Sequence, residues 1–310
     1  MEARMLYRIL TVLFVCAALA ASATSTSQAA ASGSANMLVQ TNWLAAHLTD
    51  KNLVILHVGA DRNSYDAAHI PGARFLALSE IAVSRNGIPN ELPPLDDLIN
   101  TFERLGVGDH SRVVLYGDML GLFATRAYFT LDYLGHGSST ALLDGGLEKW
   151  SREFGAVRTI PAVVTTAKLT VHPHPELIIE LPALRPIVSN HTAVLIDARP
   201  PADYAGAASG SGIPRGGHIP GAKNVFWAGT LVSRENPVFR PAAEIRAKYI
   251  AAGAKPGVRV IVYCQTGIQA AHDYFTLKLT GFRPVLYDAS FFDWSNTFGT
   301  PIETGAGGQN

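Results

Sequence analysis

The sequence predicts two α/β domains in tandem, each a doubly wound parallel sheet with helices on both faces. The first observation is that short apolar runs alternate with segments of helical spacing, and that this series occurs twice. The second is that three sequence signatures recur in the same order in both halves. A repeat of this length indicates duplicated domains, because solenoid units are much shorter.

The apolar runs are short enough to be buried strands, and the longer segments place apolar residues three and four positions apart. Gly106 ends the first such helical segment. In the first half we expect strands at 53–58, 113–116 and 140–143, and helices at 95–105 and 122–134. In the second half we expect strands at 193–197, 259–263 and 284–287, and helices at 242–252 and 268–279.

Three sequence signatures occur in both halves of the chain, and their positions indicate the domain boundaries. The His-Ile-Pro-Gly-Ala segment at His69 returns at His218, Tyr116 matches Tyr263 at a strand end, and 144–150 matches 288–294. We therefore expect domains at 37–155 and 185–305. The intervening 156–184 holds four prolines and is interpreted as a semi-stiff linker with one strand packed on a domain.

A leader precedes the first domain. Arg4 and Arg8 come before an apolar run at 9–21, which is too short to span a bilayer and is followed by small residues. This pattern is typical of a secretory signal peptide, assigned to 1–30, with cleavage near Ala23 or Ala29. An uncleaved anchor is the alternative. We expect an exported, periplasmic protein that does not associate with the membrane after cleavage.

Composition narrows the possible partners. The chain has 25 Lys and Arg against 25 Asp and Glu, so its net charge is zero and no nucleic-acid partner is indicated. It contains no CxxC or HExxH motif, and we expect neither a metal nor a cofactor. Removal of the leader removes Cys16 and leaves Cys264 as the only cysteine, which excludes an internal disulfide. We expect a monomer.

Cys264 directly follows an expected strand and precedes a glycine-containing loop and a helix start. Ligands of parallel sheets bind beyond the carboxyl ends of the strands. The N–H groups of such a loop point inward, and the helix dipole adds positive potential. Both favour the thiolate, which is the nucleophilic form of cysteine. A buried structural cysteine is the competing interpretation, because free cysteines are commonly buried.

As a set, the duplicated His-Ile-Pro-Gly-Ala turn, the Tyr-Cys-x-x-Gly loop at Cys264 and the two Asp-to-Trp stretches resemble the tandem-domain rhodanese family. These are the thiosulfate and 3-mercaptopyruvate sulfurtransferases, and the resemblance covers about 39–304. It implies a first domain without the cysteine, a catalytic second domain, and an active site in the cleft between them. The loop after Tyr116 indeed lacks a thiol.

The resemblance implies a sulfurtransferase in which Cys264 carries a persulfide. We expect it to move sulfur from thiosulfate to cyanide or a thiol acceptor, in a two-step ping-pong reaction. One alternative is a 3-mercaptopyruvate sulfurtransferase, and another is a persulfide carrier or binding module that does not turn over. A phosphatase of the Cys-x5-Arg type is disfavoured, because Ala270 stands where its arginine is needed.

The expected active-site loop departs from both well-known family patterns, and this leaves the sulfur donor open. Thiosulfate-type members often carry Arg and Lys after the cysteine, whereas mercaptopyruvate-type members carry Gly and Ser. Here Gln265 and Thr266 stand in those places, so both cations are absent, and Thr266 offers a serine-like hydroxyl. The loop, whose main-chain N–H groups are expected to hold the sulfur charge, comprises Gln265, Thr266, Gly267, Ile268 and Gln269.

Two arginines are candidates for binding the donor anion, as the resemblance implies. Arg199 follows Asp197 at a strand end, and Arg215 lies in a glycine-rich excursion at 206–217. For Arg199 the competing interpretation is an ion pair with Asp197, itself a possible site residue. For Arg215 it is a solvated loop.

The histidine of each His-Ile-Pro-Gly-Ala segment is expected to brace a tight turn, in which proline sets φ and glycine allows a positive φ. The resemblance offers a second role for His69, which is to approach the Thr266 hydroxyl with help from Asp61 or Asp66. His69 is therefore retained as a possible site residue. His272, Asp288 and Trp294 are interpreted as structural.

Overall fold

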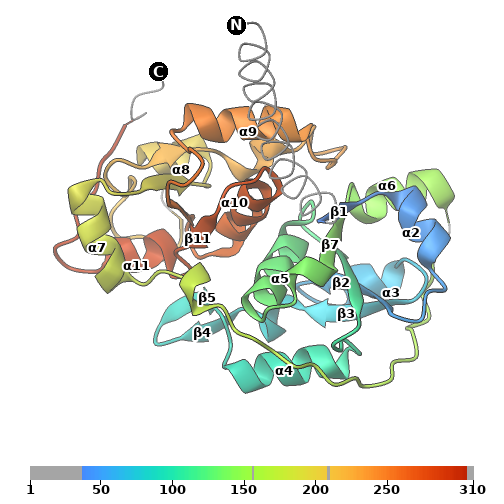
Figure 1. The fold of residues 1–310 in the computed structure, drawn as a ribbon. Helices are drawn as coiled ribbons and strands as arrows, with labels where there is room; N and C mark the ends of the chain where they lie inside the picture. Colours follow the sequence, from blue (N-terminus) through green and yellow to red (C-terminus); the bar gives the residue numbers. More distant parts are fainter. Residues whose placement is uncertain (1–36, 156, 208–209, 306–310) are drawn as a thin grey trace, which may run out of the picture.

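The computed structural model describes residues 37–155, 157–207 and 210–305, so the expected leader at 1–30 lies outside the described residues. Two α/β domains lie side by side, and the helices α5 and α10 meet between them (Figure 1). The predicted fold class is confirmed: each domain has a parallel sheet with helices on both faces. Among the described helices, none combines the length and apolarity that a bilayer crossing requires.

The first domain contains five parallel strands in the order β1-β7-β6-β2-β3. A short antiparallel hairpin, β4–β5, projects from it. The strands are β1 (Leu38–Val39), β2 (Leu53–Gly59), β3 (Ala73–Ala77), β4 (Val83–Arg85), β5 (Ile88–Glu91), β6 (Arg112–Gly117) and β7 (Thr140–Leu143). The helices are α2 (Thr41–His47), α3 (Asn63–Ala67), α4 (Leu95–Arg104), α5 (Leu122–Tyr133) and α6 (Gly146–Phe154), with short 3₁₀ turns at Leu78–Glu80 and Gly137–Ser139.

The second domain contains four parallel strands in the order β11-β10-β8-β9. The strands are β8 (Val194–Asp197), β9 (Lys223–Asn224), β10 (Val260–Tyr263) and β11 (Pro284–Leu286). The helices are α7 (Leu181–Asn190), α8 (Pro201–Ala205), α9 (Ala242–Ala251), α10 (Ile268–Leu279) and α11 (Ser290–Asn296), with 3₁₀ turns at Pro175–Leu177 and Trp227–Thr230. In the linker, Ile178 makes a parallel bridge to Leu286, as β1 does to β7.

Alternating side chains of the strands bury on opposite faces of each sheet. In strand β2, Ile55 faces the core beneath α2, α3 and α6, whereas Leu56 faces α4 and α5. The core on the α5 side continues without interruption into the core around α9 and α10 of the second domain. The two domains therefore share one hydrophobic core, while each keeps a separate smaller one on its outer face.

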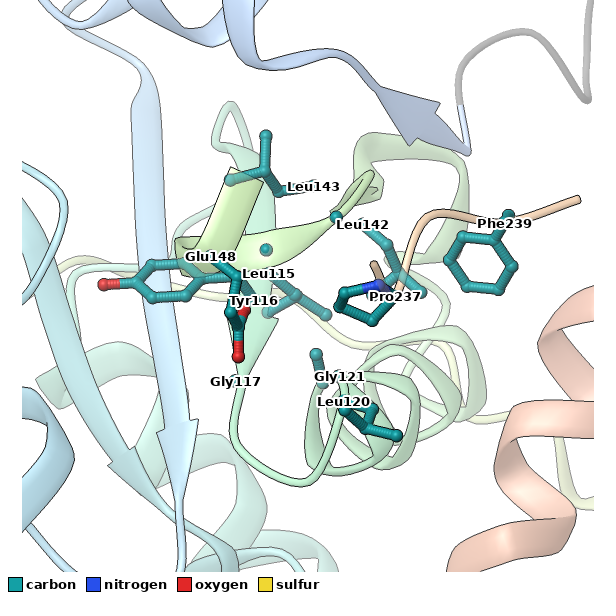
Figure 2. A pocket seen from close by; sticks show the side chains of 13 residues that line it. Leu115, Tyr116, Gly117, Leu120, Gly121, Leu142, Leu143, Glu148, Pro237 and Phe239 are labelled. Atoms are coloured by element: carbon teal, nitrogen blue, oxygen red, sulfur yellow. The ribbon is translucent and has the colours of Figure 1, made fainter. Parts of the chain in front are cut away.

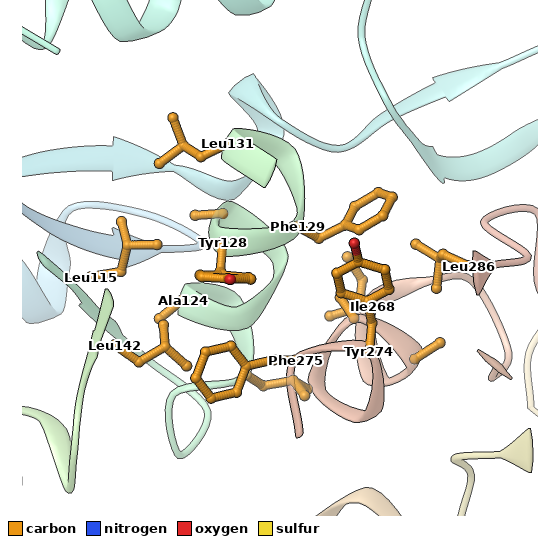
Figure 3. Close-up of a cluster of buried hydrophobic side chains, with 14 of the residues drawn as sticks. Leu115, Ala124, Tyr128, Phe129, Leu131, Leu142, Ile268, Tyr274, Phe275 and Leu286 are labelled. Carbon is orange, nitrogen blue, oxygen red and sulfur yellow. The ribbon is translucent and has the colours of Figure 1, made fainter. Parts of the chain in front are cut away.

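The contact between α5 and α10 follows an approximate twofold relation (Figure 3). The Tyr128 ring meets Phe275 edge-on at 4.9 Å, and the Phe129 ring meets Tyr274 edge-on at 5.0 Å. Aromatic pairs of this kind add about 0.5–1.5 kcal/mol beyond the area they bury. Exchanging the domains exchanges the two pairs, so duplicated helices form a self-complementary interface.

The His-Ile-Pro-Gly-Ala segments form matching turns. The Tyr116 hydroxyl accepts a hydrogen bond from the Ile70 N–H, and the Tyr263 hydroxyl accepts one from the Ile219 N–H, both at 3.1 Å. Each strand-end tyrosine thus anchors the turn of its own domain, in addition to filling the core.

Several elements were not predicted from the sequence, among them helix α7 and the β4–β5 hairpin. Helix α7 begins at Leu181, inside the expected linker, because Pro182 occupies the first helical turn, where its missing N–H costs nothing. The β4–β5 hairpin was also missed, although Asn86-Gly87 is a strong hairpin signal. Both residues have positive φ, 52° and 80°, as a type I′ turn requires.

Candidate active site

Cys264 lies directly after β10 and before α10, in the expected place. Gly267 ends the loop with φ 84°, and its missing side chain makes room for the Asp288 carboxylate. The Cys264 side chain is only 1% exposed, and it is the single free cysteine of the described residues. The prediction that this thiol follows a strand in a loop at a helix start is confirmed.

The surroundings of the sulfur are polar on the loop side. Burial raises the pKa of the Cys264 thiol, while the main-chain N–H groups of Ala270, Thr266 and Gln269 act in the opposite direction. The expected amide cradle is present. These amides favour the thiolate, as expected, but desolvation of the charged form outweighs them, so the pKa of the thiol is raised.

Ser290, at the start of α11, fastens the loop and was missed by the sequence analysis. Its hydroxyl accepts hydrogen bonds from the N–H groups of Cys264 and Gly267, at 3.1 and 3.0 Å, and donates to the Tyr287 carbonyl. The same oxygen lies 4.0 Å from the Cys264 sulfur. Ser290 adopts φ 57°, a conformation that non-glycine residues rarely take.

Arg199 and Asp197 form a buried ion pair beside the loop. The Arg199 Nε and Nη2 atoms donate to the Asp197 carboxylate at 3.0 and 2.5 Å, and its guanidinium lies 4.1 Å from the Phe291 ring centre. Burial lowers the pKa of Arg199, but Asp197 outweighs it, and Cys264 also contributes to the net rise. Arg199 is therefore both paired with Asp197 and electrostatically coupled to the thiol. Its role in binding the donor stays a prediction.

Arg215 is held away from the thiol. At the carboxyl end of α11, its guanidinium donates to the main-chain carbonyls of Trp294, Ser295, Thr297 and Thr300. It also donates to the Thr300 hydroxyl. Ser290, beside Cys264, lies at the opposite end of that helix. The structure does not bring Arg215 to Cys264, and the alternative of a solvated loop does not hold either. The carbonyl groups at the carboxyl end of a helix attract a cation. No sequence pattern predicted that the end of α11 would lie beside Arg215.

The two glutamine side chains of the loop, Gln265 and Gln269, differ in their hydrogen bonding. The Gln265 amide donates to the Ser211 carbonyl at 3.2 Å, so residue 211 of the excursion packs beside the loop. The Gln269 side-chain oxygen is buried and, among the described residues, has no hydrogen-bond partner. An unpaired buried acceptor is costly, and no group among the described residues offsets that cost. Ile268 is buried at the start of α10.

Thr266 is contacted from the other domain. The Asn90 side-chain nitrogen, from β5, lies 2.9 Å from the Thr266 hydroxyl oxygen. The Asn90 carbonyl accepts from Arg126 of α5 at 2.6 Å, and Arg126 also pairs with Asp288 at 2.5 and 3.0 Å. Both charged side chains are almost fully buried. Asn90 and Arg126 were missed from the sequence, because neither belongs to a motif around the cysteine.

His69 and His218 brace their turns, as expected. The His69 Nδ1 lies 2.7 Å from the Tyr65 carbonyl, and its Nε2 lies 3.1 Å from the Ile160 carbonyl. The His218 Nδ1 lies 2.8 Å from the Tyr204 carbonyl in the same manner. The structure does not bring His69 to Thr266, whose hydroxyl instead contacts Asn90.

Asp61 and Asp66 are the two carboxylates considered as helpers of His69. Both are exposed and form hydrogen bonds with residues at the start of α3. The Asp61 carboxylate accepts from the Asn63 N–H at 2.8 Å, and Asp66 pairs with Arg62 at 3.0 Å. The contacts that the second role of His69 requires, with Thr266 and with Asp61 or Asp66, are therefore absent among the described residues. His272 is buried against Phe239, and Asp288 and Trp294 are structural, as expected.

The matching loop of the first domain holds no comparable site. A pocket beside it, drawn in Figure 2, is closed by Pro237 and Phe239 of the second domain and leaves about 20 Å³, room for one water molecule. Asp118 of this loop is already paired: it accepts from His57 at 3.0 Å and from Ser64 at 2.9 Å. Among the residues that the structure describes, no group of three or more potential ligands is placed to hold a metal.

Fold and site together define a tandem α/β protein whose second domain carries one cysteine in an amide-lined loop. A family model described as "Rhodanese-like domain" matches the chain twice, over residues 40–153 and 183–297. The chain belongs to the rhodanese-like family.

Similar proteins point to sulfur transfer. The chain is 33% identical over 289 residues to "Sulfur carrier protein TtuD" of Thermus thermophilus, covering 87% of this chain and 97% of the relative. It is 32% identical over 290 residues to a thiosulfate sulfurtransferase of Corynebacterium glutamicum, covering 88% and 92%. The crystal structure of the 3-mercaptopyruvate sulfotransferase SseA from Escherichia coli matches with a TM-score of 0.72 and 26% identity, covering 81% and 97%. The chain is a sulfurtransferase.

Proposed function

We propose that the protein moves a sulfane sulfur from thiosulfate to cyanide or a thiol through a persulfide on Cys264. The Cys264 thiolate attacks the outer sulfur of thiosulfate, the S–S bond of thiosulfate breaks, and sulfite leaves with the electron pair. The anionic persulfide that remains is then attacked at its outer sulfur by cyanide. Thiocyanate departs, and the thiolate is restored without any external oxidant or reductant.

One observation supports this proposal above the others: three main-chain N–H groups face a sulfur that is otherwise buried. A fixed set of donors in a water-excluded site stabilises charge strongly, and the loss of one such donor typically costs about 3 kcal/mol. A persulfide on Cys264 also carries a negative charge, and the N–H groups around this sulfur are suited to stabilise it.

A second donor, 3-mercaptopyruvate, is favoured by one feature of the loop. The position that follows Gln265 carries a hydroxyl held by Asn90 in place of a cation. The kcat/KM values for thiosulfate and 3-mercaptopyruvate, with cyanide as acceptor, test the choice. A hundredfold preference for thiosulfate corresponds to about 2.7 kcal/mol of transition-state discrimination and supports the proposal. The opposite preference would replace thiosulfate with mercaptopyruvate as the donor.

The similarity to a protein named as a sulfur carrier favours a further candidate, a persulfide carrier that does not turn over. Rapid quenching separates the two functions. An enzyme releases sulfite in a burst and then continues to release it while cyanide remains. A carrier releases one equivalent per Cys264 and stops until its specific acceptor is added.

We also propose that the protein is exported to the periplasm. The support comes from the sequence alone: Arg4 and Arg8 before a short apolar run, followed by small residues. Cell fractionation tests this, with N-terminal sequencing of the mature protein. A start near residue 24 or 30 in the periplasmic fraction supports export, and an intact Met1 in the cytoplasm contradicts it.

A further inference from the structure

The β4–β5 hairpin of the first domain reaches the catalytic loop of the second. Asn90 lies in β5, the second strand of this hairpin, and its side-chain nitrogen lies 2.9 Å from the Thr266 hydroxyl oxygen. Figure 1 shows the hairpin extending from the first domain toward α11 of the second. Within the described residues this is the only hydrogen bond that the Thr266 side chain makes.

The direction of this hydrogen bond is set by chemistry. An amide nitrogen donates and does not accept, so the Thr266 oxygen is the acceptor. The hydroxyl proton of Thr266 is then left without an acceptor among the described residues. A hydroxyl that accepts one hydrogen bond also becomes a stronger donor in the next one. Thr266 therefore presents a polarised O–H group in the same loop as Cys264.

Asn90 is itself held from two sides. Its backbone has φ 62°, in the left-handed region that asparagine tolerates better than most residues. Its carbonyl accepts from Arg126 at 2.6 Å, and Arg126 is also paired with Asp288. Asp288 in turn packs against Gly267, the residue after Thr266, where an added Cβ would lie 2.3 Å from its carboxylate. Both partners of the Asn90–Thr266 hydrogen bond are thus anchored across the domain interface.

We propose that Asn90 is a positioning residue for sulfur transfer, which turns the Thr266 hydroxyl into a donor aimed at the bound sulfur donor. This inference rests on the proposed function. Thr266 would contact the anionic leaving portion of the donor molecule, sulfite or the pyruvate enolate, as the bond to the transferred sulfur breaks. Asn90 acts through Thr266 and touches no reacting atom.

The proposal assigns to the first domain a part in the reaction, although that domain has no thiol of its own. An amide does not titrate in the physiological range, so the Asn90 side chain itself adds no pH dependence to the orientation of the Thr266 hydroxyl. A histidine partner, as the family resemblance offered in His69, would titrate. The structure provides the non-titrating arrangement.

The test compares Asn90→Gly with Asn86→Gly in the full-length protein. Glycine accepts a positive φ without strain, so Asn90→Gly removes the amide while it keeps the backbone and its carbonyl. Asn86 lies in the same hairpin with φ 52°, but its side chain is exposed. We expect Asn90→Gly to lower kcat by about tenfold or more with little change in KM. Asn86→Gly should leave both constants unchanged.

A double-mutant cycle with Thr266→Val separates positioning from general loosening of the interface. In the Thr266→Val background, Asn90→Gly should cause no further loss of kcat, because the hydroxyl it orients is gone. Thr266→Ser should retain most of the activity and its dependence on Asn90. An equal loss in both backgrounds, or an unchanged kcat for Asn90→Gly, would overturn the inference. A wild-type protein that forms no Cys264 persulfide with either donor would instead refute the proposed function, and this inference with it.

Discussion

Gly117 in the first domain occupies the position that Cys264 occupies in the second. Each follows a tyrosine at the end of a central strand, and each tyrosine hydroxyl accepts a hydrogen bond from the isoleucine N–H of its own turn. The two positions differ in the space beside them. A Cβ added at Gly117 would lie 2.3 Å from the Val58 carbonyl oxygen, so no side chain fits.

This difference predicts that the first domain cannot gain activity by a single substitution. Gly117→Cys combined with Cys264→Ser should show no persulfide formation by mass spectrometry. Gly117→Ala should lower the free energy of unfolding by about 1–3 kcal/mol, because the backbone of β2 must move. Gly229→Ala is the matched control, since nothing lies within 4 Å of a Cβ added there. A stable Gly117→Cys/Cys264→Ser protein that forms a persulfide would contradict the account.

The Arg126–Asp288 ion pair joins the two domains beneath the catalytic loop. Its side chains are 0% and 4% exposed, so removal of one partner leaves the other charge buried and unpaired. We expect Arg126→Met to lower the free energy of unfolding by about 3–5 kcal/mol, measured by urea denaturation.

The control for this prediction is Arg62→Met. Arg62 also pairs with an aspartate, Asp66, but both side chains are about half exposed, at 49% and 52%. Exposed pairs contribute about 0–1 kcal/mol, so this change should be nearly neutral. Equal effects of the two substitutions would show that the buried pair does not stabilise the interface.

Glu91, next to Asn90, predicts a dependence of stability on pH. Burial, together with the nearby Asp288 carboxylate, raises its pKa to about 7 from the ordinary 4.5, and Arg126 and Arg85 oppose the rise. Between these two values the folded protein holds a proton that the unfolded chain has released. The stabilising contribution of protonated Glu91 is therefore complete below pH 4.5 and is lost as the pH rises through about 7.

The shift sets an upper bound of roughly 3 kcal/mol across the window, and solvent screening of the partly exposed carboxylate reduces it. Glu91→Gln should reduce the loss of stability between pH 5 and pH 8 in urea denaturation by up to that amount. Glu244→Gln is the control, because Glu244 is exposed beside Arg240 and should leave the pH profile unchanged. If wild type and Glu91→Gln lose stability in parallel, Glu91 does not titrate in this window.

Much of the fold was predictable because the duplicated strands and helices have clear periodicity. The expected helix at 268–279 coincides with α10, and the strand before Cys264 is β10. Helix α7 was hidden by its prolines, which indicate a linker unless one of them is placed in a first helical turn. The β4–β5 hairpin carries the Asn86-Gly87 signal, and recognition of that signal would have pointed toward Asn90.

The site was predictable only where a local motif defines it. Cys264 and its amide cradle follow from a strand, a glycine and a helix start. Ser290 and Arg126 act on the loop from distant parts of the chain, and tertiary packing alone places them there. Arg215 has the right charge in the right segment, but the carbonyls at the end of α11 bind it instead. Which partner a buried cation finds depends on packing that sequence spacing does not reveal.

The most direct test of the account is mass spectrometry of the intact protein after reaction with thiosulfate and removal of excess donor. The account predicts that wild type gains the mass of one sulfur atom, localised by fragmentation to Cys264, and loses it when cyanide is added. Cys264→Ser should remain unmodified while its circular dichroism spectrum stays that of wild type. A wild-type protein that gains no sulfur, or a Cys264→Ser protein that still transfers it, would contradict the central claim.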